Sequence, residues 1–184
     1  DGEFMQLRNV TKHNLSELDY YNAIMMKTGL LIAAACEVGA IYGGGTSEQV
    51  KALREYGVNL GCAFQIVDDL LDYLGDPGKT GKAVGNDLVE GKITLPLILA
   101  FNRATASDRQ RLLAMLEAPG ERVGHIADVA EIIERAGGFA GAREKAVAAV
   151  DKALAALQIF QGNTNRYERD VLQGLARYVL TREK

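Results

Sequence analysis

Apolar positions recur every three to four residues along nearly the whole chain, and no convincing stretch shows the period of two that is typical of a β-strand. We therefore predict an all-α fold and a single helical domain, residues 1–184. Pro96 is expected to kink the third helix or to lie where the freed carbonyl finds another partner. The expected helices are 18–42, 47–74, one from near Leu88 that includes Pro96, 107–117, 123–136, 139–160 and 167–181.

The two longest predicted helices carry clear end signals. Three glycines, 43–45, end the first, and Thr46 with Gln49 forms a capping box that begins the second. Within the second helix, Gly57 and Gly61 lie four residues apart. Each costs about 1 kcal/mol relative to alanine in a helix. We therefore interpret them as positions where another helix approaches closely.

The composition is that of a globular protein. The chain has 184 residues, of which 48% are hydrophobic and 24% charged, and its net charge of -3 provides no general basic surface for nucleic acid. Cys36 and Cys62 lie in apolar runs, which favours two buried thiols in a reducing, cytoplasmic compartment over a disulfide.

No uncharged stretch approaches the roughly 18 residues that a transmembrane helix needs, so a soluble protein is expected. The first residues, "DGEFMQL", include no initiator methionine and no signal-peptide pattern. We expect the chain to be part of a longer polypeptide.

Three carboxylates lie together in the stretch "FQIVDDLLD". The spacing predicts that Asp68, Asp69 and Asp72 project toward one side of a helix, in an otherwise apolar setting where they repel one another. A cation would relieve that repulsion, and hard oxygen ligands without His or Cys suit Mg²⁺ shared with substrate phosphates. The alternative is a solvated acidic helix face.

A glycine-rich segment with lysines follows the carboxylates. Lys79, Lys82 and Lys92 are point charges suited to phosphate oxygens, and the glycines let the backbone approach a bulky anion. Together with a bound metal they predict a diphosphate site. A P-loop is excluded, because Tyr73 stands where its first glycine is required and the segment follows a helix.

These stretches resemble a known family. "FQIVDDLLD", "GKAVGNDLVEGKITLPLI" and the upstream "KTGLLIAAACEVGA" are similar to the second half of trans-isoprenyl diphosphate synthases, in particular the bacterial polyprenyl synthases of octaprenyl type. The resemblance covers essentially the whole chain. It implies an isoprenoid-synthase-type helical bundle around a central cavity, here without its N-terminal helices, and a cytoplasmic homodimer.

The resemblance also implies a reaction. An allylic diphosphate ionises with the help of Mg²⁺, isopentenyl diphosphate attacks the carbocation, and a proton is lost, which gives a polyprenyl diphosphate. The likeness leans toward the long-chain members, whose products are membrane-seeking. Asp68, Asp69 and Asp72 match the second aspartate-rich motif, which binds Mg²⁺, with Asp68 as the favoured direct ligand.

Further positions match substrate-binding residues of the family. Lys27 would bind the allylic diphosphate, Thr28 would guide the transferred fragment, and Gln65 would stabilise the carbocation. The remaining matches are the diphosphate-binding Lys82 and the trailing motif with Asp87 and Lys92. For Lys27 the alternative is a surface lysine, and for Gln65 a structural amide.

The chain departs from the family pattern in what it lacks. It contains no first aspartate-rich motif, no arginine pair after one and no Gly-Gly-Lys-Arg segment, so we expect these 184 residues to be inactive alone. Competing hypotheses are a non-catalytic subunit of a heteromeric synthase, a helical interaction scaffold and a terpene cyclase. The Gly-Lys-x-Thr ending favours chain elongation over cyclisation.

Overall fold

A computed structural model describes residues 2–75, 84–162 and 166–182. Within those ranges the regular structure is entirely helical, which confirms the predicted all-α class. The elements are α1 (Gly2–Thr11), α2 (Glu17–Ile24), the π-helical turn η1 (Met25–Gly29), α3 (Leu30–Tyr42), α4 (Ser47–Leu74), α6 (Asn86–Val89), α7 (Leu95–Arg103), α8 (Ala106–Glu117), the 3₁₀ segment η2 (Pro119–His125), α9 (Ile126–Arg135), α10 (Gly138–Ala156), the 3₁₀ turn η3 (Leu157–Ile159) and α11 (Arg166–Thr181).

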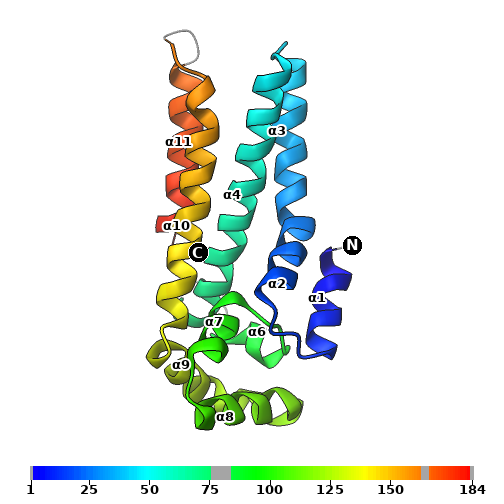
Figure 1. The fold of residues 1–184 in the computed structure, drawn as a ribbon, viewed down its shortest axis with the longest axis vertical. Coiled ribbons are helices and arrows are strands. Elements are labelled where there is room, and N and C mark those ends of the chain that lie inside the picture. The colour runs from blue at the N-terminus through cyan, green and yellow to red at the C-terminus, as the bar shows by residue number, and fades with distance from the viewer. Residues whose placement is uncertain (1, 76–83, 163–165, 183–184) are drawn as a thin grey trace.

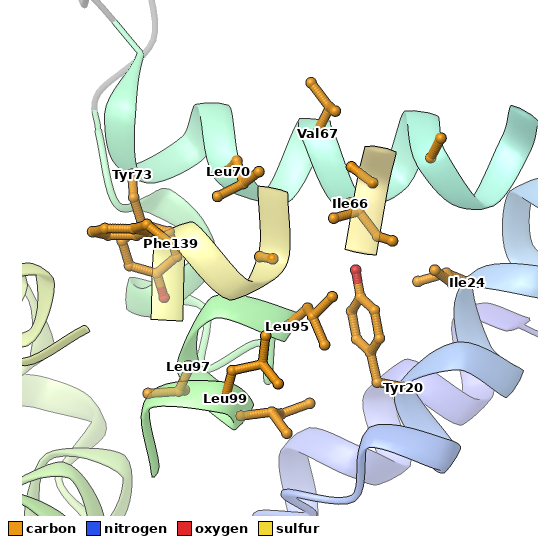
Figure 2. Packing of buried hydrophobic residues seen from close by; sticks show 14 of the residues in the cluster. Tyr20, Ile24, Ile66, Val67, Leu70, Tyr73, Leu95, Leu97, Leu99 and Phe139 are labelled. Carbon is orange, nitrogen blue, oxygen red and sulfur yellow. The ribbon is translucent and has the colours of Figure 1, made fainter. Parts of the chain in front are cut away.

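The long helices stand roughly upright, and the shorter helices α6 to α9 gather at one end of them (Figure 1). Helix α4 lies at the centre, because it packs along α3 on one side and along α10 on the other. The core lies between these helices and α7. Its side chains include Ile66, Leu95 and Leu97, and the rings of Tyr73 and Phe139, 5.6 Å apart, join α4 to α10 (Figure 2).

Helix α4 has the predicted bounds. The Thr46 side chain accepts from the Gln49 backbone and the Gln49 side chain from the Thr46 backbone, so the capping box is present. The two glycines of α4 also behave as predicted, because a Cβ on Gly57 would lie 2.6 Å from Ala33 Cα and one on Gly61 2.7 Å from Gly29 Cα. Both glycines therefore mark a close approach of the preceding helical run.

Two predicted helices differ in their interior. The run 18–42 is interrupted by η1, where the backbone N–H of Leu30 bonds to Met25 O, five residues back. Pro96 does not kink a helix: it lies in the first turn of α7, where its missing N–H costs nothing, and a separate short helix, α6, precedes it. Gly91, at φ +76°, ends that short helix in the left-handed conformation.

The helical run Glu17–Tyr42 is long and apolar enough to cross a membrane by length and composition alone, although Lys27 and Glu37 interrupt it. The core helix of a soluble protein meets the same criterion, so this is weak evidence for a membrane span. Cys36 and Cys62 are both free thiols, and they are partly rather than fully buried.

Candidate active site

A chain of hydrogen bonds joins α2, η1 and α4. The Tyr20 hydroxyl donates to Asp69 Oδ2 at 2.7 Å, Gln65 Nε2 donates to Asp69 Oδ1 at 3.1 Å, and the Thr28 hydroxyl donates to Gln65 Oε1 at 3.1 Å. Gln65 and Asp69 are one turn apart on α4, so both side chains face the α2–η1 run. The structure thus brings two predicted residues, Thr28 and Gln65, into direct contact.

The three aspartates do not share one side of α4, and the prediction that they do is wrong for Asp69. Asp69 is only 2% exposed and bonds to Tyr20, whereas the side chain of Asp68 is 56% exposed and bonds to Arg182. Adjacent helical residues point about 100° apart, and this separates Asp68 from Asp69. Asp68 and Asp72, four apart, remain on the same side.

Burial and hydrogen bonding act in opposite directions on the pKa of Asp69. Burial raises the pKa of Asp69 to about 7, while the hydrogen bonds from Tyr20 and Gln65 act in the opposite direction by favouring the ionised form. Burial, followed by the nearby Asp69 charge, raises the pKa of the Tyr20 phenol well above its usual value. Tyr20 therefore stays a hydrogen-bond donor.

Asp72 joins α4 to the segment around α6. Its carboxylate accepts from the backbone N–H of Asp87 at 3.0 Å, and its carbonyl accepts from Gly85 N at 2.7 Å. Burial and the Asp87 carboxylate raise the pKa of Asp72 to about 6. A second acidic side chain therefore adjoins Asp72 at the end of α4, and a cation would relieve the repulsion between the two.

Lys92 and Asp87, predicted to act together, form an ion pair at 2.7 Å, and Glu90 lies 2.9 Å from the same ammonium. Burial disfavours the Lys92 charge, but the hydrogen bonds to Asp87 and Glu90 outweigh this and raise the pKa of Lys92. The pKa of Glu90 is lowered by Lys92 and, to a smaller degree, by Lys27. The Lys92 charge is therefore held between two carboxylates.

Lys27 projects toward α1 from the π-helical turn. Its ammonium lies 3.2 Å from Glu3 Oε1 and donates to Gln6 Oε1 at 3.1 Å, and its side chain is 26% exposed. Turns of π-helix often occur at functional sites. Lys79 and Lys82, the other predicted phosphate-binding lysines, lie outside the described residues.

Two residues of the site were not predicted. Arg182, which follows α11, donates to Asp68 Oδ1 and to the Phe64 carbonyl, both at 3.1 Å, and its guanidinium lies 3.9 Å from the Phe64 ring centroid. Tyr20 is the other. A tyrosine within an apolar helical run, whose hydroxyl needs a partner once buried, was the available signal for it; the contact of Arg182 spans 114 residues and leaves no local signal.

The donor set at Asp68 and Asp72 suits Mg²⁺. This ion is commonly held by one or two carboxylates and completes its coordination with waters and substrate phosphates. The described residues contain no group of three or more His, Cys, Asp or Glu that could hold a metal by itself. The two aspartates therefore fit Mg²⁺ with diphosphate, and Asp69 is committed elsewhere.

An all-helical bundle with an aspartate motif on one helix and a lysine–threonine pair on the neighbouring helical run is what the resemblance to isoprenoid synthases predicts. The family model for polyprenyl synthetases matches residues 1–133, and the chain belongs to that family.

Similar sequences support the assignment to this family. The chain is 38% identical over 185 residues to the octaprenyl diphosphate synthase of Escherichia coli K12, and 37% identical over 183 residues to a short chain isoprenyl diphosphate synthase of Methanothermobacter thermautotrophicus. All of this chain is covered in each case, against 56% and 55% of the relative, so the chain spans about half the length of these proteins.

A solved structure supports the fold. The polyprenyl synthase from Caulobacter crescentus, complexed with calcium and isoprenyl diphosphate, superimposes with a TM-score of 0.91 at 37% identity. It matches 100% of this chain and 55% of that one. The predicted isoprenoid-synthase-type bundle is thereby confirmed.

Proposed function

We propose that the protein is a Mg²⁺-dependent prenyltransferase that condenses isopentenyl diphosphate with an allylic diphosphate to give a long-chain trans-polyprenyl diphosphate. The observation that carries the proposal is the contact of Thr28 with Gln65, which holds the turn that carries Lys27 and Thr28 against the helix that bears Asp68 and Asp72. The family and the relative named octaprenyl diphosphate synthase support the reaction class.

Each residue has a role that its chemistry allows. Asp68 and Asp72 would hold Mg²⁺, which when bound neutralises the diphosphate and assists its departure. Lys27, Lys82 and Lys92 would offset the negative charge that grows on the leaving group. Gln65 would turn its amide oxygen toward the allylic cation.

Gln65 is buried beside apolar residues of α4 such as Ile66, and such surroundings would keep water from the cation. The motif D-D-x-x-D occurs once in the sequence, with Asp68 as its first residue, and matches the second aspartate-rich motif of the family, while the first is not present in these 184 residues. We accordingly propose that the 184 residues do not turn over on their own. From the resemblance to the family alone, we also propose that the complete protein is a cytoplasmic homodimer.

A second candidate is a component of a two-component synthase. One relative, 33% identical over 183 residues, is the heptaprenyl diphosphate synthase component 2 of Geobacillus stearothermophilus. In that case the complete protein alone makes no product, and activity returns when its partner is added.

The test is a prenyl-transfer assay on the complete polypeptide that contains this chain. Farnesyl diphosphate, isopentenyl diphosphate and Mg²⁺ are supplied, product length is read by mass, and EDTA abolishes the product. Asp68→Ala should lower kcat by about 10²-fold, as the loss of a group that stabilises transition-state charge commonly does. Asp151→Ala, on the exposed side of α10, is the matched control, and near wild-type turnover by Asp68→Ala would refute the assignment.

A further inference from the structure

A tyrosine and a carboxylate are buried together between α2 and α4. Tyr20 is 5% exposed and Asp69 2% exposed, and the hydroxyl of Tyr20 points toward α4 beside Ile66 and Ile24 (Figure 2). A buried carboxylate is costly unless it is hydrogen-bonded. Among the described residues its side-chain donors are Tyr20 and Gln65, and both bond to it.

This arrangement decides which way the Gln65 amide points. Gln65 Nε2 donates to Asp69 Oδ1, and while Asp69 is ionised it can only accept, which holds the amide nitrogen toward it. The amide oxygen must then face the other way, where the Thr28 hydroxyl donates to it. The two ends of an amide are nearly equal in size, so packing alone does not select between the two orientations.

We propose that Tyr20 is a positioning residue that holds the Asp69 carboxylate against Gln65 and so keeps the Gln65 amide oxygen turned toward Thr28. The inference rests on the proposed prenyl transfer for its catalytic consequence. An oxygen carries partial negative charge and stabilises a nearby carbocation, whereas an NH₂ group in its place repels the cation. Tyr20 thus acts on the transition state through Asp69 and Gln65, without touching substrate.

The test uses Tyr20→Phe in the complete protein, which removes only the hydroxyl. Because the oxygen matters in the transition state, kcat should fall by about tenfold while KM for both diphosphates stays within about twofold. Tyr21→Phe is the matched control: its ring lies 5.7 Å from that of Tyr20, and its hydroxyl makes no hydrogen bond to the described residues. It should leave kcat unchanged.

A double-mutant cycle separates positioning from a structural role. In a Gln65→Met background the amide is gone, so the Tyr20→Phe effect on kcat should vanish. An effect of equal size in both backgrounds, or an equal effect of Tyr21→Phe, would overturn the proposal. Asp69→Asn, which keeps the volume but adds a donor, is a second variant should Tyr20→Phe fold poorly, and it should show the same loss and the same dependence on Gln65.

A readout that needs no activity distinguishes this inference from the proposed function. The side-chain NH₂ signals of Gln65, assigned by their absence in Gln65→Met, should shift in ¹⁵N spectra of Tyr20→Phe and stay in place in Tyr21→Phe. If the wild-type protein makes no prenyl product but these signals shift, the proposed function fails and the positioning stands. If the wild-type protein transfers prenyl groups but the Gln65 signals do not shift in Tyr20→Phe, the proposal that Tyr20 positions Gln65 is refuted.

Discussion

The close contact between α4 and the preceding helical run makes a prediction that separates stability from catalysis. A Cβ on Gly57 would lie 2.6 Å from Ala33 Cα, with two further backbone atoms under 3.0 Å. One on Gly61 would lie 2.7 Å from Gly29 Cα, and the next atom is at 3.1 Å. Since the opposing atoms are backbone, the two helices must move apart if alanine replaces either glycine.

Two opposing effects set the change in the free energy of unfolding when alanine replaces either glycine. Overpacking a close contact costs about 1–3 kcal/mol, while glycine to alanine inside a helix regains about 1 kcal/mol. Gly57→Ala, with three close backbone atoms, should lower the free energy of unfolding by about 2 kcal/mol, and Gly61→Ala by about 1 kcal/mol. A domain of 150–250 residues loses about 2–4 °C per kcal/mol and a longer chain loses less, so Tm should fall by at most about 8 °C for Gly57→Ala and about 4 °C for Gly61→Ala.

The effects on catalysis should run in the opposite order. Gly29 is the neighbour of Thr28, and Gly61 lies one turn before Gln65, so Gly61→Ala acts directly at their 3.1 Å hydrogen bond. Ordinary contact begins at 3.4 Å, and the shift of about 0.7 Å that restores it would stretch that bond to about 3.8 Å, beyond hydrogen-bonding range. Misplacement of this size costs roughly tenfold or more in kcat.

The assay compares thermal unfolding and prenyl transfer of the complete protein. Gly174→Ala is the control, because a Cβ on this helical glycine of α11 would have nothing within 4 Å among the described residues, and the variant should gain about 1 kcal/mol. Gly57→Ala should keep kcat within about threefold although it loses the most stability. A higher Tm for Gly57→Ala, or equal kcat losses in both α4 variants, would contradict this account of the helix contact.

Two further predictions concern the segment around α6. Arg122 is 5% exposed and donates to the carbonyls of Leu116 at 2.6 Å and Val89 at 3.4 Å. Arg122→Met should therefore lower the free energy of unfolding by about 1–3 kcal/mol in a urea titration. An unchanged midpoint would show that these hydrogen bonds contribute nothing to stability. Lys92→Gln should raise KM for the allylic diphosphate, and more at low salt than at high salt, because salt screens the partly exposed charge of Lys92. An increase in KM that does not depend on salt would indicate that the ion pair of Lys92 with Asp87 is structural.

The sequence predicted those parts of the fold that depend on local signals. The bounds of α4 follow from the Thr46 cap, and the close helix contact follows from glycines in an otherwise good helical pattern. The prediction for Pro96 was wrong because a proline in the first turn and one in the interior look alike when the helix start is not marked by a strong cap. The π-helical turn η1 makes the buried positions step by five residues, from Ile24 to Gly29, but the run is apolar around most of the helix, so its periodicity did not reveal this step.

The candidate site was predictable in its residue types but not in its partners. Spacing correctly groups Asp68 with Asp72, yet it says nothing of what faces each one, and Asp69 is paired by a tyrosine 49 residues away. Such contacts depend on how α2 packs on α4, which is a property of the tertiary structure. The sequence pattern therefore identified a carboxylate motif, and the packing gave its members different partners: Arg182 for Asp68, Tyr20 and Gln65 for Asp69, and the backbone of Asp87 for Asp72.

The π-helical turn η1 also gives neighbouring residues of the site different partners. Lys27 and Thr28 are consecutive, yet Lys27 reaches α1 and Thr28 reaches Gln65 on α4, so the turn directs a charge and a hydroxyl toward different neighbours. The contact between Gly29 and Gly61 fixes how near that turn lies to α4. Because Tyr20 bonds to α4 on the other side of the turn, the position of Gln65 is constrained both before and after η1. A change that loosens either constraint should affect the reaction through the same amide.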